Sequence, residues 1–237
     1  MKKLTLILSL FSLISIANAA TSSSAPVASS PAKSTSKTAS KDSAVVIVNA
    51  SNCDVDTPCY VIKTSATQLS QAVNQNLSDK EAMTMIQNSI VPQIDFNLMT
   101  KFAMGNSWKQ ANPEQQTKIT QLFQQLLVYQ YSSALSKFKG AQVSIDSSTI
   151  NGEKQNKAAV KGTFKLPSNG KSTNQPVNIE WDLAKIASNW KIYDVKIENV
   201  SIVTTYRTQF NDTMQNEGVD SLIKQLQTKI NTLQGKS

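Results

Sequence analysis

Residues 190–210 read WKIYDVKIENVSIVTTYRTQF and combine a strand pattern with the start of a helix pattern. Apolar and polar residues alternate in the first part, which is typical of a half-buried strand, and after a two-residue break the spacing becomes helical. The apolar side chains on one parity of the strand and after the break are Tyr193, Val195, Ile197, Val200 and Val203. Such a surface is either part of an ordinary core or the lining of a cavity for an apolar ligand.

Three more segments with strand patterns precede this stretch, at 141–146, 157–166 and 176–184. Each alternates apolar and polar residues, and the apolar side includes Phe164 in the second segment and Trp181 in the third. The loop between these two is rich in turn-forming residues. The sequence therefore predicts an antiparallel sheet of four strands, the fourth at 189–197, with one face covered and the other in water.

Helical spacing precedes the predicted sheet. A helix is expected from about residue 60, and another begins after Ser78, which is placed to form a capping box with Glu81. Asn112 and Pro113 suit the first positions of a long helix that extends to about residue 138. The broad apolar stripe of this helix includes Leu122 and Leu126.

After the sheet, residues 200–232 predict two helices with a break at Gly218. The order along the chain is therefore helices, then strands, then helices. Strands and helices that are segregated in this way predict an α+β domain.

The N-terminus has the three parts of a secretory signal peptide: two lysines, a short apolar run and a small-residue end at 17–19. The apolar run is too short to span a bilayer about 30 Å thick, so we expect residues 1–19 to be cleaved on export. Residues 20–44 are Ser, Ala, Thr, Pro and Lys with little apolar bulk, which predicts a flexible leader. Residues 45–237 are then expected to form the exported domain, with no membrane anchor.

Charge and composition narrow the class of function. The formal net charge is +8, and loss of Lys2 and Lys3 with the signal peptide leaves +6. A cationic protein favours anionic surfaces such as acidic lipid headgroups. Nucleic acid is a poor alternative, because the basic residues are scattered and export removes the protein from it. The chain has no histidine, which excludes His-based triads and general bases.

The chain has two cysteines, Cys53 and Cys59. Export would place them in an oxidising compartment, where such a pair tends to form a disulfide. A structural zinc site needs more ligands than two cysteines and no histidine can supply. We therefore expect a disulfide, no metal site and no cofactor.

Three groups of residues, in order along the chain, carry a family resemblance. The first comprises Val91-Pro92, Met104-Gly105 with Trp108, Pro113 to Gln115, Leu122-Phe123, and Tyr131 with Leu135. The second comprises Trp190, Tyr193-Asp194, Glu198 to Ser201 and Tyr206-Arg207, and the third is Gly218 to Leu222. Over roughly residues 60–232 this pattern resembles the MlaC family, periplasmic phospholipid-binding proteins of toluene-tolerance type. Two features depart from the family pattern: Asn199 stands where the family has Gly, and the cysteine loop and Ser-rich leader are additional.

The resemblance implies an NTF2-like fold, a curved sheet wrapped by helices around an apolar lipid cavity. It implies a periplasmic carrier, not an enzyme, that shuttles phospholipid between an outer-membrane lipoprotein complex and an inner-membrane ABC transporter and so maintains outer-membrane lipid asymmetry. We expect a monomer with no nucleic-acid partner and no stable membrane insertion. The residues expected to line the cavity are Met104, Leu122, Leu126, Phe164, Trp181, Tyr193, Val195, Ile197, Val200 and Val203.

Other interpretations of the same residues stay open. Arg207 either meets the lipid phosphate, because a guanidinium forks onto its oxygens, or pairs with a carboxylate of the fold. The acid pairs Glu180/Asp182 and Asp194/Glu198 either serve an NTF2-like cavity enzyme or lie on solvated strand edges. A buried carboxylate with a raised pKa in the cavity would favour the enzyme. A third hypothesis is an envelope chaperone or adaptor that binds proteins through an apolar surface.

Overall fold

We describe the fold from a computed structural model of the chain. The structure describes residues 46–48, 53–74, 78–132, 141–165 and 175–235. The chain divides into two units, Met1–Ser40 and Lys41–Ser237, and all the described residues belong to the second. The predicted signal peptide at 1–19 and the predicted leader at 20–44 lie outside the described residues.

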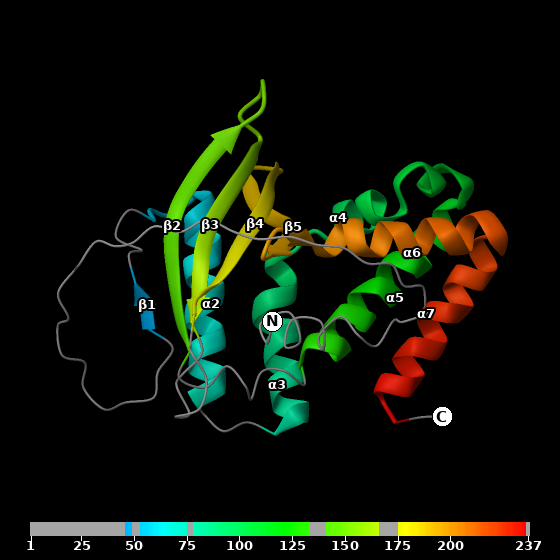
Figure 1. The fold of residues 1–237 in the computed structure, drawn as a ribbon, viewed down its shortest axis with the longest axis horizontal. Helices are drawn as coiled ribbons and strands as arrows, with labels where there is room; N and C mark the ends of the chain where they lie inside the picture. Colours follow the sequence, from blue (N-terminus) through cyan, green and yellow to red (C-terminus); the bar gives the residue numbers. More distant parts are fainter. Residues whose placement is uncertain (1–45, 49–52, 75–77, 133–140, 166–174, 236–237) are drawn as a thin grey trace, which may run out of the picture. The chain divides into compact units, whose positions relative to one another are not determined.

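A six-stranded sheet has its strands in the order of the sequence (Figure 1). Its four long strands are antiparallel neighbours, as predicted: β2 (Gln142–Asn151), β3 (Lys157–Lys165), β4 (Val177–Ile186) and β5 (Asn189–Ile197). The predicted number of four is wrong, because β1 (Val46–Val48) pairs in parallel with β2 and β6 (Val200–Ser201) pairs with β5. Strands of three and two residues are too short for alternation to reveal them.

One face of the sheet, here called the apolar face, is built from four rows of directly opposed residues. Residues opposite one another in neighbouring strands share a face. Within the apolar face, Gly162 is required by close packing, because a Cβ there would overlap the carbonyl oxygen of Ser144. The rows are Val143–Phe164–Val177, Ile145–Gly162–Ile179–Ile197, Val160–Trp181–Val195 and Ala158–Leu183–Ile192.

A bulge in β5 changes the predicted alternation. Asp194 faces Asp182 and Ile192 faces Leu183, so Tyr193 has no partner in β4. One extra residue reverses which side chains share a face. The prediction that Tyr193 lies on the same face as Val195 and Ile197 is therefore wrong: its ring packs instead edge-on against Phe102, with the centroids 5.2 Å apart.

The helices have the following bounds. Before the sheet come α2 (Pro58–Asn74), α3 (Asp79–Met85), a π turn (Ile86–Ile90), a 3-10 turn (Val91–Gln93), α4 (Phe96–Met104), a second 3-10 turn (Gly105–Gln110) and α5 (Pro113–Ser132). After it come α6 (Ile202–Asn216) and α7 (Val219–Leu233). Helix α2 packs along the sheet, whereas α4, α5, α6 and α7 pack on one another beyond β5 (Figure 1).

The predicted helix starts are confirmed by their capping contacts. The backbone N–H of Ser78 donates to Glu81 Oε2 (2.9 Å), and the N–H of Glu81 faces Ser78 Oγ (3.4 Å). Asn112 and Gln115 form the same reciprocal pair at the start of α5, at 3.0 and 2.9 Å. The predicted break at Gly218 separates α6 from α7, with φ at 84°. The predicted extension of α5 to residue 138 lies outside the described residues.

Candidate functional site

Part of the apolar face is only partly covered. The row Ala158–Leu183–Ile192 is buried, as are Val143, Ile145 and Val160. Six apolar neighbours in the remaining positions are half-buried, and together they are here called the apolar strip: Phe164, Val177, Ile179, Trp181, Val195 and Ile197. A contiguous apolar surface that the fold leaves partly uncovered is a mark of a binding site.

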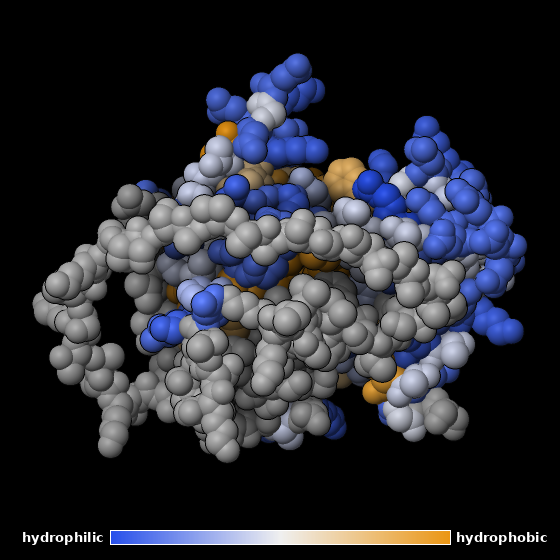
Figure 2. Space-filling model, viewed as in Figure 1, coloured by the Kyte–Doolittle hydropathy of each residue, from blue (hydrophilic) through white to orange (hydrophobic). Residues whose placement is uncertain are grey.

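Helix α2 extends this surface from the strip to the other helices. Ala66 of α2 packs against the buried pair Ala141 and Val143, as do Phe164 and Trp181 of the strip. One turn later, Leu69 packs against the buried pair Ile86 and Val128. Four half-buried residues complete this second group, here called the helical cluster: Met83, Met85, Ile90 and Val91. Figure 2 shows hydrophilic residues over the end of the β2–β3 hairpin and over α6 and α7, with hydrophobic residues visible where the sheet meets the helices.

The apolar strip and the helical cluster can make apolar contacts, but their side chains include no acid, base or nucleophile. Their side chains are aliphatic, aromatic and thioether groups, and methionine in particular adapts its shape to irregular apolar partners. Such a surface suits a long, flexible apolar chain better than a compact polar substrate.

The ten residues predicted to line a cavity do not form one group. Four belong to the apolar strip, namely Phe164, Trp181, Val195 and Ile197. Four are buried in the helices: Met104, Leu122, Leu126 and Val203. Tyr193 lies on the opposite face of the sheet, and Val200 is 46% exposed in β6.

The helical core around α5 and α6 is closely packed. The ring of Phe123 meets those of Tyr206 and Phe210 edge-on, at 4.8 and 5.2 Å between centroids. The hydroxyl of Tyr206 donates to Gln130 Oε1 (3.0 Å), and burial raises the pKa of Tyr206. Packing of this density explains why the helical members of the predicted set are core residues in this structure.

Sequence reasoning missed Val177, Ile179 and the helical cluster as candidate site residues. Val177 and Ile179 alternate with polar residues in step with Trp181, so the sequence did place all three on one face of the strand. Only the pairing with β5 shows that this face is also that of Val195 and Ile197. For the cluster, a signal was the apolar and methionine content of residues 83–91.

The polar face of the sheet carries an ion-pair network. Lys196 Nζ lies 2.7 Å from Glu180 Oε1 and 2.9 Å from Asp182 Oδ2, and Lys161 Nζ lies 3.3 Å from Glu180 Oε2. The hydrogen bond from Lys196 lowers the pKa of Glu180, whereas burial raises that of Asp182. Burial alone would lower the pKa of Lys196, but its hydrogen bonds to Glu180 and Asp182 raise it. The raised carboxyl pKa therefore belongs to an ion pair on the face opposite the apolar strip.

Asp194 is a buried structural carboxylate. It is 5% exposed, so the interpretation of a solvated strand edge is wrong for this residue. Its Oδ1 accepts from the N–H groups of Val195 (2.8 Å) and Val203 (3.1 Å), and its Oδ2 accepts from the Ser201 hydroxyl (2.5 Å). Because Val203 is in the first turn of α6, the carboxylate joins β5 to the N-terminal end of that helix.

Glu198 also has a structural contact. Glu198 and Asn199 form the two-residue turn between β5 and β6 and have positive φ angles of 49° and 66°. Asn at the second position favours a turn of this kind. Glu198 Oε1 accepts from the N–H of Asn178 (2.7 Å), and the N–H of Glu198 donates to the carbonyl of Asn178 (2.9 Å). These two bonds hold Glu198 in the left-handed conformation.

Arg207 lies against the end of α4. Its Nε donates to the carbonyl oxygen of Phe102 (2.8 Å), and its side chain passes over Gly105. No carboxylate among the described residues forms an ion pair with it, so the predicted alternative of a carboxylate partner is not found there.

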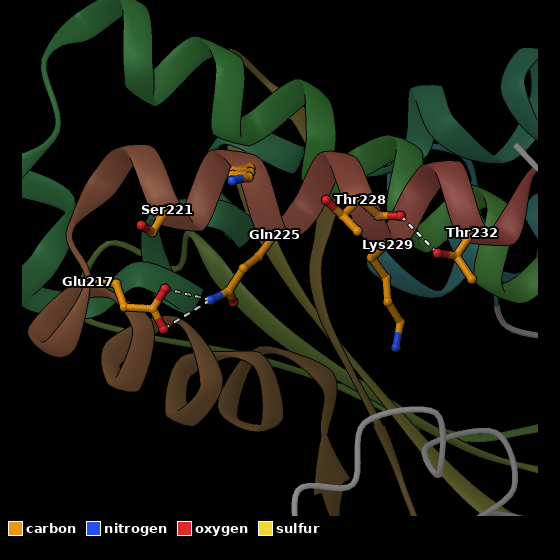
Figure 3. Close-up of a pocket in the computed structure, with 7 residues that line it drawn as sticks. Glu217, Ser221, Gln225, Thr228, Lys229 and Thr232 are labelled. Atoms are coloured by element: carbon orange, nitrogen blue, oxygen red, sulfur yellow. Dashed lines mark hydrogen bonds between the residues drawn. The ribbon is translucent and has the colours of Figure 1, made fainter. Parts of the chain in front are cut away.

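A groove of about 410 Å³ lies along α7 (Figure 3). Gln225 Nε2 donates to the Glu217 carboxylate across it, at 3.3 and 3.4 Å, and burial lowers the pKa of Lys229. Hydroxyl, amide and charged groups line this groove, and none of the predicted cavity residues does. Its lining residues are Glu217, Ser221, Lys224, Gln225, Thr228, Lys229 and Thr232.

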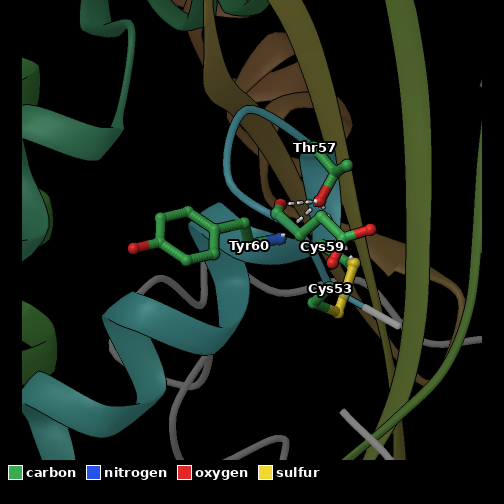
Figure 4. The surroundings of a disulfide bond; sticks show 5 residues. Cys53, Thr57, Cys59 and Tyr60 are labelled. Carbon is green, nitrogen blue, oxygen red and sulfur yellow. Dashed lines mark hydrogen bonds between the residues drawn. A yellow bond between two sulfur atoms is a disulfide. The ribbon is translucent and has the colours of Figure 1, made fainter. Parts of the chain in front are cut away.

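Cys53 and Cys59 form a disulfide just before and within the first turn of α2, with their Cα atoms 5.3 Å apart (Figure 4). Thr57 Oγ1 donates to the carbonyl of Asp54 (2.6 Å) and tightens the enclosed turn. Both cysteines are buried against the apolar face, in a cluster that includes Trp190 and Ile192. The disulfide therefore fixes the start of α2 on the sheet.

The described part of the chain contains neither a cluster of metal ligands nor a membrane-spanning helix. There, no three acidic, cysteine or histidine side chains converge as a metal site would require. No helix in the same residues has the length and apolar content needed to cross a bilayer.

Comparisons with known proteins agree on one family. Residues 63–228 match the family described as MlaC protein. The intermembrane phospholipid transport system binding protein MlaC of Haemophilus influenzae is 22% identical over 146 residues, which is 61% of this chain and 66% of that protein. The toluene tolerance protein ttg2D of Pseudomonas putida is 25% identical over 170 residues, 69% of this chain and 76% of that protein.

A solved structure has the same fold. It is a phospholipid-binding protein from Ralstonia solanacearum in complex with a phospholipid. The two chains align with a TM-score of 0.66 at 25% identity, over 75% of this chain and 99% of the other.

Proposed function

The chain belongs to the MlaC family, and we propose that it is a non-enzymatic carrier that binds phospholipid and moves it between the membranes of the cell envelope. The observation that carries the proposal is the apolar strip, six neighbouring apolar side chains that the described fold leaves half-buried. The strip and the helical cluster are proposed to contact the acyl chains, in place of the ten-residue lining expected from sequence.

Physical chemistry explains why a carrier needs such a surface. At about 0.8 kcal/mol per methylene, two chains of about sixteen carbons cost about 25 kcal/mol in water. A soluble carrier must therefore cover the chains with apolar side chains, whereas the headgroup can stay hydrated. No proton transfer or nucleophile is required, and the carboxylates Asp182 and Asp194 are engaged in an ion pair and a helix cap.

Native mass spectrometry of the purified exported protein tests the carrier. We expect a protein peak with added mass equal to one or more phospholipids, which organic extraction removes. Extraction followed by lipid mass spectrometry identifies the bound species. Protein that carries no lipid after expression and also takes up none from vesicles would contradict the carrier and favour the chaperone or adaptor.

We propose further that the protein works in the periplasm, between an outer-membrane lipoprotein complex and an inner-membrane ABC transporter. Chains that leave the strip must not enter water, so transfer should need contact with an acceptor whose own apolar channel continues the surface. The formal charge of +8, or +6 after export, favours a partly electrostatic contact.

Transfer from loaded protein is expected to be faster to vesicles that hold the transporter than to bare vesicles. The rate should fall as salt rises, because screening shortens to about 8 Å at physiological ionic strength. Fluorescent phospholipid measures the transfer, and vesicles with an unrelated membrane protein serve as control. Equal rates to all three kinds of vesicle would refute docking and leave a carrier without a specific acceptor.

A further inference from the structure

Two cations, Lys157 and Arg207, contact one residue of α4, Phe102. The ring of Phe102 lies edge-on to Tyr193, and Lys157 Nζ lies over both rings, 5.5 Å from the first centroid and 5.7 Å from the second. At the backbone of the same residue, the Phe102 carbonyl accepts from Arg207 Nε (2.8 Å). Residues of α4, β3, β5 and α6 thus meet at this point.

Neither cation has a carboxylate partner in the described part of the chain. Burial raises the pKa of the neighbouring Tyr193, and three carboxylates raise it further by their charge: Asp182, Glu180 and Asp194. The first two pair with Lys196, and the third accepts three hydrogen bonds.

Both cations are also positioned in advance. An ammonium over two aromatic faces is attracted by the rings and stays hydrated on its outer side. The bond from Nε to the Phe102 carbonyl fixes the guanidinium and leaves its terminal N–H groups for another acceptor, and a guanidinium forks well onto phosphate. Lys101, which precedes Phe102 in the sequence, is exposed and adds a third positive charge in the last turn of α4.

We propose that Lys157, Arg207 and Lys101, arranged around Phe102, form a docking surface for the phosphates of an anionic membrane. An array of lipid phosphates matches several separate cations, which one small anion cannot do. A half-buried aromatic side chain among the cations also suits the interface between headgroups and acyl chains. Lys157, the strand residue of this surface, lies on the face of the sheet opposite the apolar strip, so the surface is separate from the acyl-chain site.

Vesicle binding measures this surface directly. Sedimentation with vesicles of phosphatidylglycerol and phosphatidylcholine gives the affinity of the wild-type protein, Lys157→Gln, Arg207→Gln and the charge-matched control Lys154→Gln. Lys154 is an exposed residue of the β2–β3 turn. Each surface variant should bind anionic vesicles about fivefold more weakly and the double variant about 25-fold, whereas the control should bind as wild type.

Conservative variants separate charge from fold. Lys157→Arg and Arg207→Lys keep the charge and should keep most of the vesicle binding. Binding to phosphatidylcholine should be weak for every variant, and rising salt should remove the difference between variants and wild type. The phospholipid content of the purified protein, which tests the carrier function separately, should not change in any of them.

Three results would overturn the proposal. The control variant could lose as much binding as Lys157→Gln, which would indicate a net-charge effect. The wild-type protein could fail to prefer anionic vesicles. Finally, the variants could bind vesicles normally and slow transfer only when the transporter is present, which would assign the surface to a protein partner.

Discussion

Val195→Glu is expected to lower the phospholipid content of the purified protein about a hundredfold. Val195 is half-buried in the apolar strip and opposes Trp181 in the neighbouring strand. A carboxylate at this position would have to be desolvated beside an acyl chain, at a cost of about 3 kcal/mol, which corresponds to a factor of about 100 in affinity. Lipid extraction with a phosphorus assay measures the ratio of lipid to protein.

The matched control is Thr163→Glu. Thr163 is also half-buried in the sheet, but it opposes Ser144 and Asn178 on the polar face. The same new charge should there leave the lipid content unchanged. Ile179→Glu, in a second row of the strip, should reproduce the loss if Val195→Glu folds poorly, and circular dichroism checks the fold of each. Normal lipid content in both strip variants, or equal loss in Thr163→Glu, would contradict the assignment of the acyl-chain site.

The long elements of this fold could be predicted because their sequence patterns are long. Alternation over six to ten residues revealed β2 to β5, although β2 extends to Asn151, beyond the predicted end at residue 146. Ser78 and Asn112 marked helix starts through side chains that cap the backbone. The two short strands could not be predicted, since β1 and β6 have three and two residues and depend on pairing with distant parts of the chain.

The candidate site was harder to predict because it depends on register and packing. The bulge at Tyr193 puts Ile192, which alternation assigned to the other face, on the same face of the sheet as Val195. Nothing in the local pattern predicts such an insertion, because the extra residue is defined only by its partner strand. Helix α5 shows a second difficulty: its apolar stripe predicted burial correctly but could not separate a core contact from a ligand contact.

Replacing Asp194 is expected to give the largest loss of stability among single changes to the acidic residues discussed above. Asp194→Ala removes the acceptor of three hydrogen bonds and leaves the N–H of Val203 and the hydroxyl of Ser201 without this partner. Bonds to a charged group contribute about 1.5–3 kcal/mol, and a buried donor left unpaired costs about 1–3 kcal/mol. We expect the free energy of unfolding, measured by urea denaturation, to fall by about 3–4 kcal/mol.

Two further variants distinguish the cap from a catalytic role. Asp194→Asn keeps an oxygen for the two N–H groups, so its loss should be about 1 kcal/mol. Asp146→Ala removes an exposed carboxylate that accepts from the Ser144 hydroxyl (2.6 Å) and should cost less than about 0.5 kcal/mol. An acid–base residue of a cavity enzyme is commonly kept at the expense of stability, so its removal would leave the protein equally or more stable. A stable Asp194→Ala variant would therefore contradict the cap and reopen the enzyme hypothesis, whereas the expected ranking of Ala, Asn and the Asp146 control assigns the carboxylate to holding α6 against β5.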